Sequence, residues 1–149
     1  MIYLRTPEEK ANQEAWWERP DEIFFSAGAC HILASTFLRL FPEAEFEAVM
    51  IKPREGFRGG HVMVTDRKIA IDAHGAHPAS EVLSNYYAEM HVRERGWDAQ
   101  VLTVQQDPAS WEFCRTHGYR HPAKKSRQKA ENERASRVRR VDISPYEAG

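Results

Sequence analysis

Cysteine is scarce in this sequence, and the scarcity limits the class of protein. Only two cysteines, Cys30 and Cys114, occur among its 149 residues. Two are too few for the disulfide framework that holds small secreted domains together. We therefore expect both thiols to be reduced, as in a cytoplasmic protein.

Long apolar runs are also missing. No stretch approaches the roughly 20 apolar residues that cross a membrane. The opening residues MIYLR lead into charged positions and not into the apolar segment of a secretory signal. The sequence therefore predicts a cytoplasmic protein without a membrane partner, although an effector exported without such a signal would have the same pattern.

The chain as a whole has almost no excess of either charge, but one segment has a strong excess of positive charge. The net charge is −1, yet residues 122–140 hold eight lysines or arginines against two glutamates, a local charge of +6 that leaves −7 for the rest. Hydrophobic residues make up 42% of the chain, which is enough for one packed core. We expect one α+β domain over residues 1–120 and a basic tail over 121–149. The tail is either a solvated segment or a site for an anionic partner at 122–140.

One segment combines a small-residue turn with a strongly apolar stretch, FFSAGACHILASTFLRLFP, over residues 24–42. Apolar residues at helical spacing predict a helix from Cys30 to Phe41 that ends before Pro42. A thiol at a helix start has a lowered pKa and is a candidate nucleophile, whereas a buried core thiol is the alternative. His31 lies about 100° around the axis from Cys30, which predicts packing or capping. We expect Cys114 to be a core residue.

A second segment, GGHVMVTDRKIAIDAHG, predicts a hairpin with strands His61–Thr65 and Lys68–Asp72. If Asp66 and Arg67 form the centre of the loop, cross-strand partners have residue numbers that sum to 133. His61 then lies opposite Asp72, with both side chains on one face, and the valines and isoleucines between them point to the core.

These residues suit nucleophilic catalysis if Cys30 approaches them. His61 would pair with the thiolate and protonate the leaving group, and Asp72 would hold the imidazole tautomer. The backbone N–H of Cys30 would meet the oxyanion. We expect Gly28 to let the chain pass close to a substrate, and Gly60 and His74 to border the site.

A cysteine at a helix start, followed by GGHVMV and IDAHG, resembles the papain-like cysteine hydrolase superfamily, most of all its transglutaminase-like and cell-wall-peptidase-like members. The resemblance covers roughly residues 24–75. It implies a papain-like core in which the Cys-bearing helix packs on a small antiparallel sheet. It also implies that Cys30, His61 and Asp72 are nucleophile, base and orienting acid. Ser26 stands near the place where papain-type enzymes carry a glutamine donor.

The resemblance implies a cysteine hydrolase or acyl transferase, without a cofactor, that acts on an amide bond through a Cys30 thioester. The substrate would be a peptide, an isopeptide, a glutamine-type side chain or a small amide. Arg54, Glu55 and Arg58 in the loop before His61 would bind a substrate carboxylate or form a solvated loop.

Two other classes of function stay open. A non-enzymatic binding or adaptor module of the same fold would act through its basic tail. A metal-dependent enzyme would use Asp72, His74 and His77, with His61 opposite, because imidazole and carboxylate ligands suit zinc or iron.

Overall fold

Five helices and five strands follow one another in the part of the chain that the computed structural model describes, residues 2, 4–12, 19–26 and 28–122. The predicted tail, with its expected anionic partner, lies outside these residues except for its first two positions. The elements are α1 (Pro7–Ala11), α3 (Asp21–Ser26), α4 (Cys30–Leu40), β1 (Glu47–Pro53), β2 (His61–Thr65), β3 (Ile69–Asp72), β4 (Gly75–Pro78), α5 (Ala79–Arg93), β5 (Ala99–Val104) and α6 (Trp111–His117).

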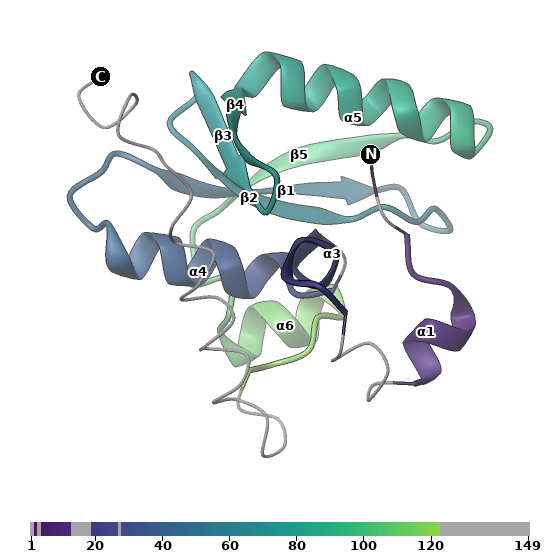
Figure 1. Ribbon diagram of the computed structural model, residues 1–149, viewed down its shortest axis with the longest axis horizontal. Coiled ribbons are helices and arrows are strands. Elements are labelled where there is room, and N and C mark those ends of the chain that lie inside the picture. Colours follow the sequence, from purple (N-terminus) through teal and green to yellow (C-terminus); the bar gives the residue numbers. More distant parts are fainter. Residues whose placement is uncertain (1, 3, 13–18, 27, 123–149) are drawn as a thin grey trace.

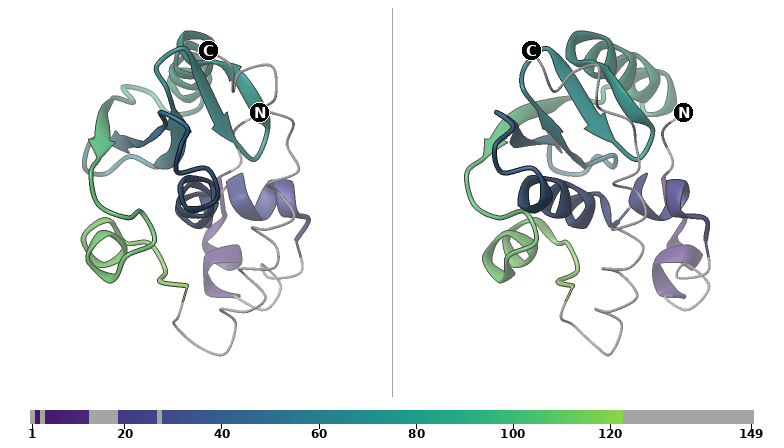
Figure 2. Two further views of the ribbon diagram at one scale, coloured as in Figure 1. Left: turned by 90° about the vertical axis from the view of Figure 1, so that its left-hand side faces the viewer. Right: turned by 60° about the vertical axis from the view of Figure 1, so that its left-hand side comes forward.

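The strands form one antiparallel sheet in the order β4-β3-β2-β1-β5, and helices cover both faces (Figure 1). Helix α4 lies on one face and α5 on the other, an arrangement that both views of Figure 2 also show. The predicted α+β class is thus confirmed. None of the described helices is long and apolar enough to span a membrane.

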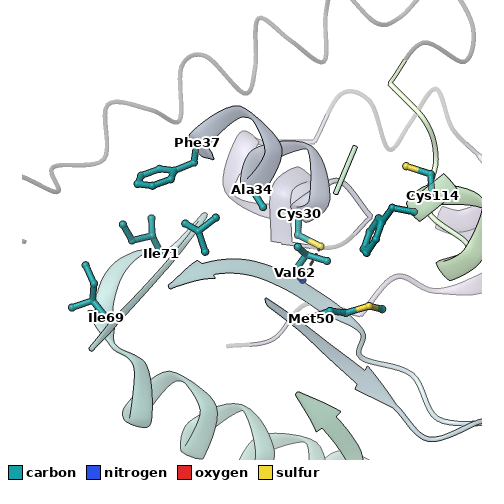
Figure 3. Packing of buried hydrophobic residues seen from close by; sticks show 10 residues of the cluster. Cys30, Ala34, Phe37, Met50, Val62, Ile69, Ile71 and Cys114 are labelled. Carbon is teal, nitrogen blue, oxygen red and sulfur yellow. Dashed lines mark hydrogen bonds between the residues drawn. The ribbon is translucent and has the colours of Figure 1, made fainter. Parts of the chain in front are cut away.

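Helix α4 is apolar enough to be buried along most of its length. Its first eight residues, 30–37, are all buried, because the sheet covers one side and α3 contacts the helix as well. The face toward the sheet packs Ala34 and Phe37 against valines and isoleucines of β2 and β3 (Figure 3). The predicted helix start at Cys30 is confirmed, and the end comes at Leu40, one residue before the predicted one.

A second core lies on the α5 face of the sheet. It is built around Met63 of β2, Met90 of α5 and Trp97, each at most 2% exposed. The Trp97 indole N–H donates to the backbone oxygen of Arg58 at 2.7 Å. Strand β2 is therefore buried on both faces. A strand in this position needs apolar side chains throughout, which explains the unbroken apolar run between His61 and Thr65.

The hairpin of β2 and β3 has a register that differs from the predicted one by two residues. Val64 pairs with Ile71 and Thr65 with Ala70, so the partners sum to 135 and His61 is not directly opposite Asp72. The loop is wider because the Asp66 carboxylate accepts backbone N–H groups of residues 68 and 69, at 2.8 and 2.9 Å. A shift of two residues preserves the face of every side chain, because the side-chain period of a strand is two.

Candidate active site

The Cys30 sulfur lies at the start of α4, where β2 and β3 separate. The described β2–β3 pairing begins at Val64, so the sheet is open beside Val62. There the Val62 N–H donates to Cys30 Sγ at 3.4 Å, and the sulfur takes the place of a strand acceptor. Figure 3 shows the Cys30 side chain against Val62. The residue is 2% exposed.

His61 and Asp72 meet although they are diagonal and not opposite in the sheet. Diagonal positions lie about 7–8 Å apart, which a long side chain can span. The His61 Nε2–H donates to Asp72 Oδ2 at 2.9 Å, while Asp72 Oδ1 accepts the His74 N–H at 2.9 Å. The Tyr86 ring stacks on the imidazole with centroids 5.7 Å apart. The imidazole is therefore fixed on two sides, and Nδ1 is the ring nitrogen left for the sulfur.

The electrostatics favour a charged Cys–His pair. Burial raises the pKa of Cys30, but hydrogen bonds and charge from His31 and His61 outweigh burial and lower this pKa to about 5. Burial lowers the pKa of His61, but Asp72 and the Cys30 thiolate outweigh it and raise the value to about 10. At neutral pH the pair is a thiolate beside an imidazolium, with the proton on His61.

Two further side chains touch the sulfur, and the sequence analysis missed both. The buried His31 interacts with Cys30, although its place on the helix predicted only packing or capping. Its Nε2–H donates to the Arg120 carbonyl at 2.7 Å. The Tyr119 hydroxyl hydrogen-bonds Cys30, and the Tyr119 ring lies 4.6 Å from that of His31.

Removing the Tyr119 hydroxyl should make the thiol less acidic. A hydrogen bond to a charged group is worth about 1.5–3 kcal/mol, so Tyr119→Phe should raise the pKa of Cys30 by about one to two units. The phenyl ring retains the contacts with His31 and Phe113. The ultraviolet absorbance of the thiolate, followed against pH, measures the change. Tyr87→Phe, whose hydroxyl donates to Ala99 far from the sulfur, is the control.

Two clefts lie beside the neighbours of Cys30, and Cys30 itself is not among the residues that line either one. The larger one, about 450 Å³, is lined by Gly28, Gly60 and Tyr119 among others, and the smaller one, about 260 Å³, by His61, Asp72 and His74. Ser26 and Tyr86 line both clefts, so the clefts meet there. The predicted substrate-binding residues thus lie around the two clefts: Ser26, Gly28 and Gly60 at the larger, Ser26 and His74 at the smaller. The side chains of Ser26 and His74 are hydrogen-bonded to each other at 3.2 Å.

His74 and His77, which the sequence offers as metal ligands, form hydrogen bonds within the protein. The His77 Nε2–H donates to the backbone oxygen of His74 at 3.2 Å. Within the residues that the structure places, no group of three or more histidine, cysteine, aspartate or glutamate side chains is arranged to hold a metal ion. Asp72 serves His61 instead, so the spacing of Asp72, His74 and His77 does not produce a ligand set.

Cys114 lies in the core, as predicted. It is 2% exposed and belongs to the cluster beneath α4, and both cysteines are free thiols. Its sulfur lies 3.9 Å from the Pro108 carbonyl oxygen. The lowered thiol pKa belongs to Cys30, whose sulfur interacts with His61. Cys30 is therefore the thiol that this arrangement activates.

No protein-family model, no curated protein and no solved structure matches this chain. Its chemistry is therefore inferred from the site itself. A buried thiolate can attack a carbonyl carbon, and an imidazolium held by a carboxylate can protonate the group that leaves.

Proposed function

We propose that the protein is a cysteine-dependent hydrolase or acyl transferase that acts on amide bonds. The observation that carries the proposal is the His61–Asp72 hydrogen bond of 2.9 Å beside a thiol whose pKa is lowered to about 5. A cysteine that only packs in the core needs neither an oriented imidazole beside it nor a lowered pKa. The arrangement instead has the nucleophile, base and orienting acid of a catalytic triad.

The reaction uses groups already described. Cys30 Sγ attacks the carbonyl carbon, and the backbone N–H groups at the start of α4, where no side chain caps the helix, stabilise the oxyanion. The C–N bond breaks as His61 gives its proton to the departing amine, leaving a thioester on Cys30. Water or a second amine then attacks the thioester, His61 accepts a proton from it, and the thiolate leaves.

The resemblance to papain-like enzymes supports this proposal. Helix α4 packs on an antiparallel sheet, and the neighbouring strands β2 and β3 carry His61 and Asp72. This is the order and arrangement that the resemblance implies for nucleophile, base and orienting acid. We therefore propose a papain-like core, with a peptide, a glutamine side chain or a small amide as the substrate.

The test is a panel of substrates with a mass readout. Unfolded proteins, glutamine-containing peptides and small amides are incubated with the wild type and with Cys30→Ala, with and without added amines. Chain cleavage, deamidation or amine incorporation that requires Cys30, together with an acyl adduct on the Cys30 peptide, would support the proposal. Turnover that persists in Cys30→Ala, or no turnover across the panel despite a reactive Cys30, would contradict it.

A further inference from the structure

Part of the first turn of α4 is already hydrogen-bonded and is not offered to a substrate. The N–H groups of Ile32 and Leu33 both donate to the Ala29 carbonyl, at 3.0 and 3.3 Å. The Ser26 hydroxyl, which stands near the place of the papain-type glutamine donor, is hydrogen-bonded with His74 at 3.2 Å. Each donor aimed at a developing oxyanion accelerates acyl transfer by a large factor. A further donor beside the sulfur would therefore have a direct use in catalysis.

The Tyr119 hydroxyl lies both at the sulfur and at the larger cleft. It hydrogen-bonds Cys30, and the Tyr119 side chain packs against the core cluster that contains Cys30. Its oxygen lies 3.5 Å from the position that a methyl group on Gly60 would occupy, and Gly60 directly precedes His61. Tyr119 also lines the larger cleft, which Cys30 does not. A carbonyl group that approaches the sulfur from this cleft therefore passes the Tyr119 hydroxyl.

Contacts of the backbone and of the ring hold Tyr119 in this position. Gly118 ends α6 with a positive φ of 73°, and the Tyr119 N–H then donates to the Cys114 carbonyl at 2.8 Å. The Tyr119 ring stacks on Phe113 with centroids 5.7 Å apart, and its centroid lies 4.6 Å from that of His31. A donor held by such contacts needs little reorganisation when charge develops near it, which is the condition for strong electrostatic catalysis.

The negative charge beside Tyr119 moves during the proposed reaction. Before the attack the charge is on the Cys30 sulfur, and the hydroxyl donates to it. When the Sγ–C bond forms, the π electrons of the carbonyl move to its oxygen, which is two bonds away from the sulfur and within reach of the same hydroxyl. Burial and the negative charge of Cys30 raise the pKa of Tyr119 well above its ordinary value, so the hydroxyl keeps its proton and can donate at every stage.

We propose that the Tyr119 hydroxyl is a catalytic donor, which hydrogen-bonds the carbonyl oxygen of the substrate as that oxygen becomes an oxyanion. This inference rests on the proposed acyl transfer to Cys30. The backbone N–H of Cys30 is the other donor. When the intermediate collapses, the C=O bond forms again, the C–N bond breaks, and the amine takes its proton from His61. His61 therefore transfers protons, whereas Tyr119 only stabilises charge.

Two reagents that react with the same thiolate test this role without amide turnover. p-Nitrophenyl acetate acylates a thiolate through a tetrahedral oxyanion, whereas iodoacetamide alkylates it by direct displacement. The ratio of the two rates at Cys30, measured at about pH 8 with Cys30→Ala as the blank, does not depend on the thiolate fraction. We expect Tyr119→Phe to lower the acylation-to-alkylation ratio at least about tenfold, since one lost oxyanion donor costs about 10²–10³ in rate. Tyr87→Phe, whose hydroxyl donates to the Ala99 carbonyl, should leave the ratio unchanged.

The ratio separates a catalytic role of Tyr119 from its effect on the pKa of the thiol. A more basic thiolate reacts faster with both reagents, so a change in pKa alone leaves the ratio nearly constant. A constant ratio in Tyr119→Phe would therefore overturn the inference. If that variant does not fold, replacement of Tyr119 by ortho-fluorotyrosine retains the packing and provides a stronger donor, which should raise the ratio about twofold. No rise in the folded fluorotyrosine protein would then count against the inference.

Amide substrates separate this inference from the proposed function. Cys30-dependent amide turnover that falls about 10²- to 10³-fold in Tyr119→Phe would support both. Amide turnover that is equal in the wild type and in Tyr119→Phe would overturn the inference and leave the proposed function intact. Acylation by p-nitrophenyl acetate that requires the Tyr119 hydroxyl, without turnover of any amide, would leave the oxyanion donor intact and overturn the proposed function.

Discussion

Replacing His61 with glutamine should make Cys30 react more slowly with iodoacetamide at pH 6 and faster at pH 9. With a pKa of about 5, Cys30 is almost fully ionised at pH 6. Without the imidazolium its pKa should return toward the ordinary value of 9.0, which leaves less than about 1% thiolate at pH 6. The more basic thiolate is intrinsically more reactive, which partly compensates. The alkylation rate at pH 6 should therefore fall about tenfold. The pH–rate profiles of the wild type and the variant should cross at about pH 7.

The crossing is the diagnostic feature, because a merely less accessible thiol would react more slowly at every pH. His91→Gln is the matched control, since His91 is exposed on α5 and its Nδ1–H donates to the Tyr87 carbonyl oxygen of its own helix. Peptide mapping keeps Cys30 separate from Cys114. Superimposable profiles for wild type and His61→Gln would show that His61 does not hold the thiolate. Any amide turnover should also fall, by about 10²- to 10⁴-fold, because the general acid is lost.

The stability of the wild-type protein should be nearly independent of pH between about 6.5 and 9, as far as the Cys–His pair is concerned. In this range the folded pair holds one proton, on His61, and the unfolded chain also holds one, on Cys30, given ordinary pKa values of 6.5 and 9.0. Below pH 6.5 the unfolded histidine binds a second proton, so stability falls by about 2 kcal/mol as the pH approaches 5. Above pH 9 the unfolded thiol loses its proton, and stability falls by about 1 kcal/mol toward pH 10.

Cys30→Ser provides the comparison for this profile. Without the thiol, the unfolded chain carries no proton at this pair above pH 6.5, while the folded His61, raised in pKa by Asp72, still does. The free energy of unfolding should therefore decline from pH 6.5 upward in the variant and stay level in the wild type. Urea unfolding at half-unit pH steps measures both. A wild-type profile parallel to that of Cys30→Ser would show that no thiolate–imidazolium pair forms.

Local sequence patterns were sufficient to predict the helix that carries the thiol and to predict which hairpin residues share a face. Small residues followed by an apolar periodic run marked the start of α4 at Cys30. The hairpin register was wrong by two residues because the Asp66 carboxylate widens the loop, a side-chain effect that counting cannot include. His61 and Asp72 nevertheless meet, since an even shift keeps both on one face.

What the sequence did not reveal depends on contacts between distant segments. Strand β4 contains Gly75 and Pro78, which disfavour a strand, and it forms only by pairing with β3 at the sheet edge. Tyr119 reaches the sulfur because the chain reverses at Gly118, whose φ is 73°. Arg5 lies against Gly28 through packing of the N-terminal segment. None of these approaches leaves a periodicity or a motif.

In the reaction that we propose, the position of the sulfur gives the thioester intermediate a thermodynamic cost. In the free protein, Cys30 Sγ accepts the Val62 N–H at the place where β3 provides no partner. A thioester sulfur carries no negative charge and is a weak acceptor, so acylation leaves that buried amide poorly satisfied. Release of the acyl group restores the bond. The unsatisfied Val62 N–H therefore destabilises the thioester and favours its hydrolysis or transfer over its accumulation.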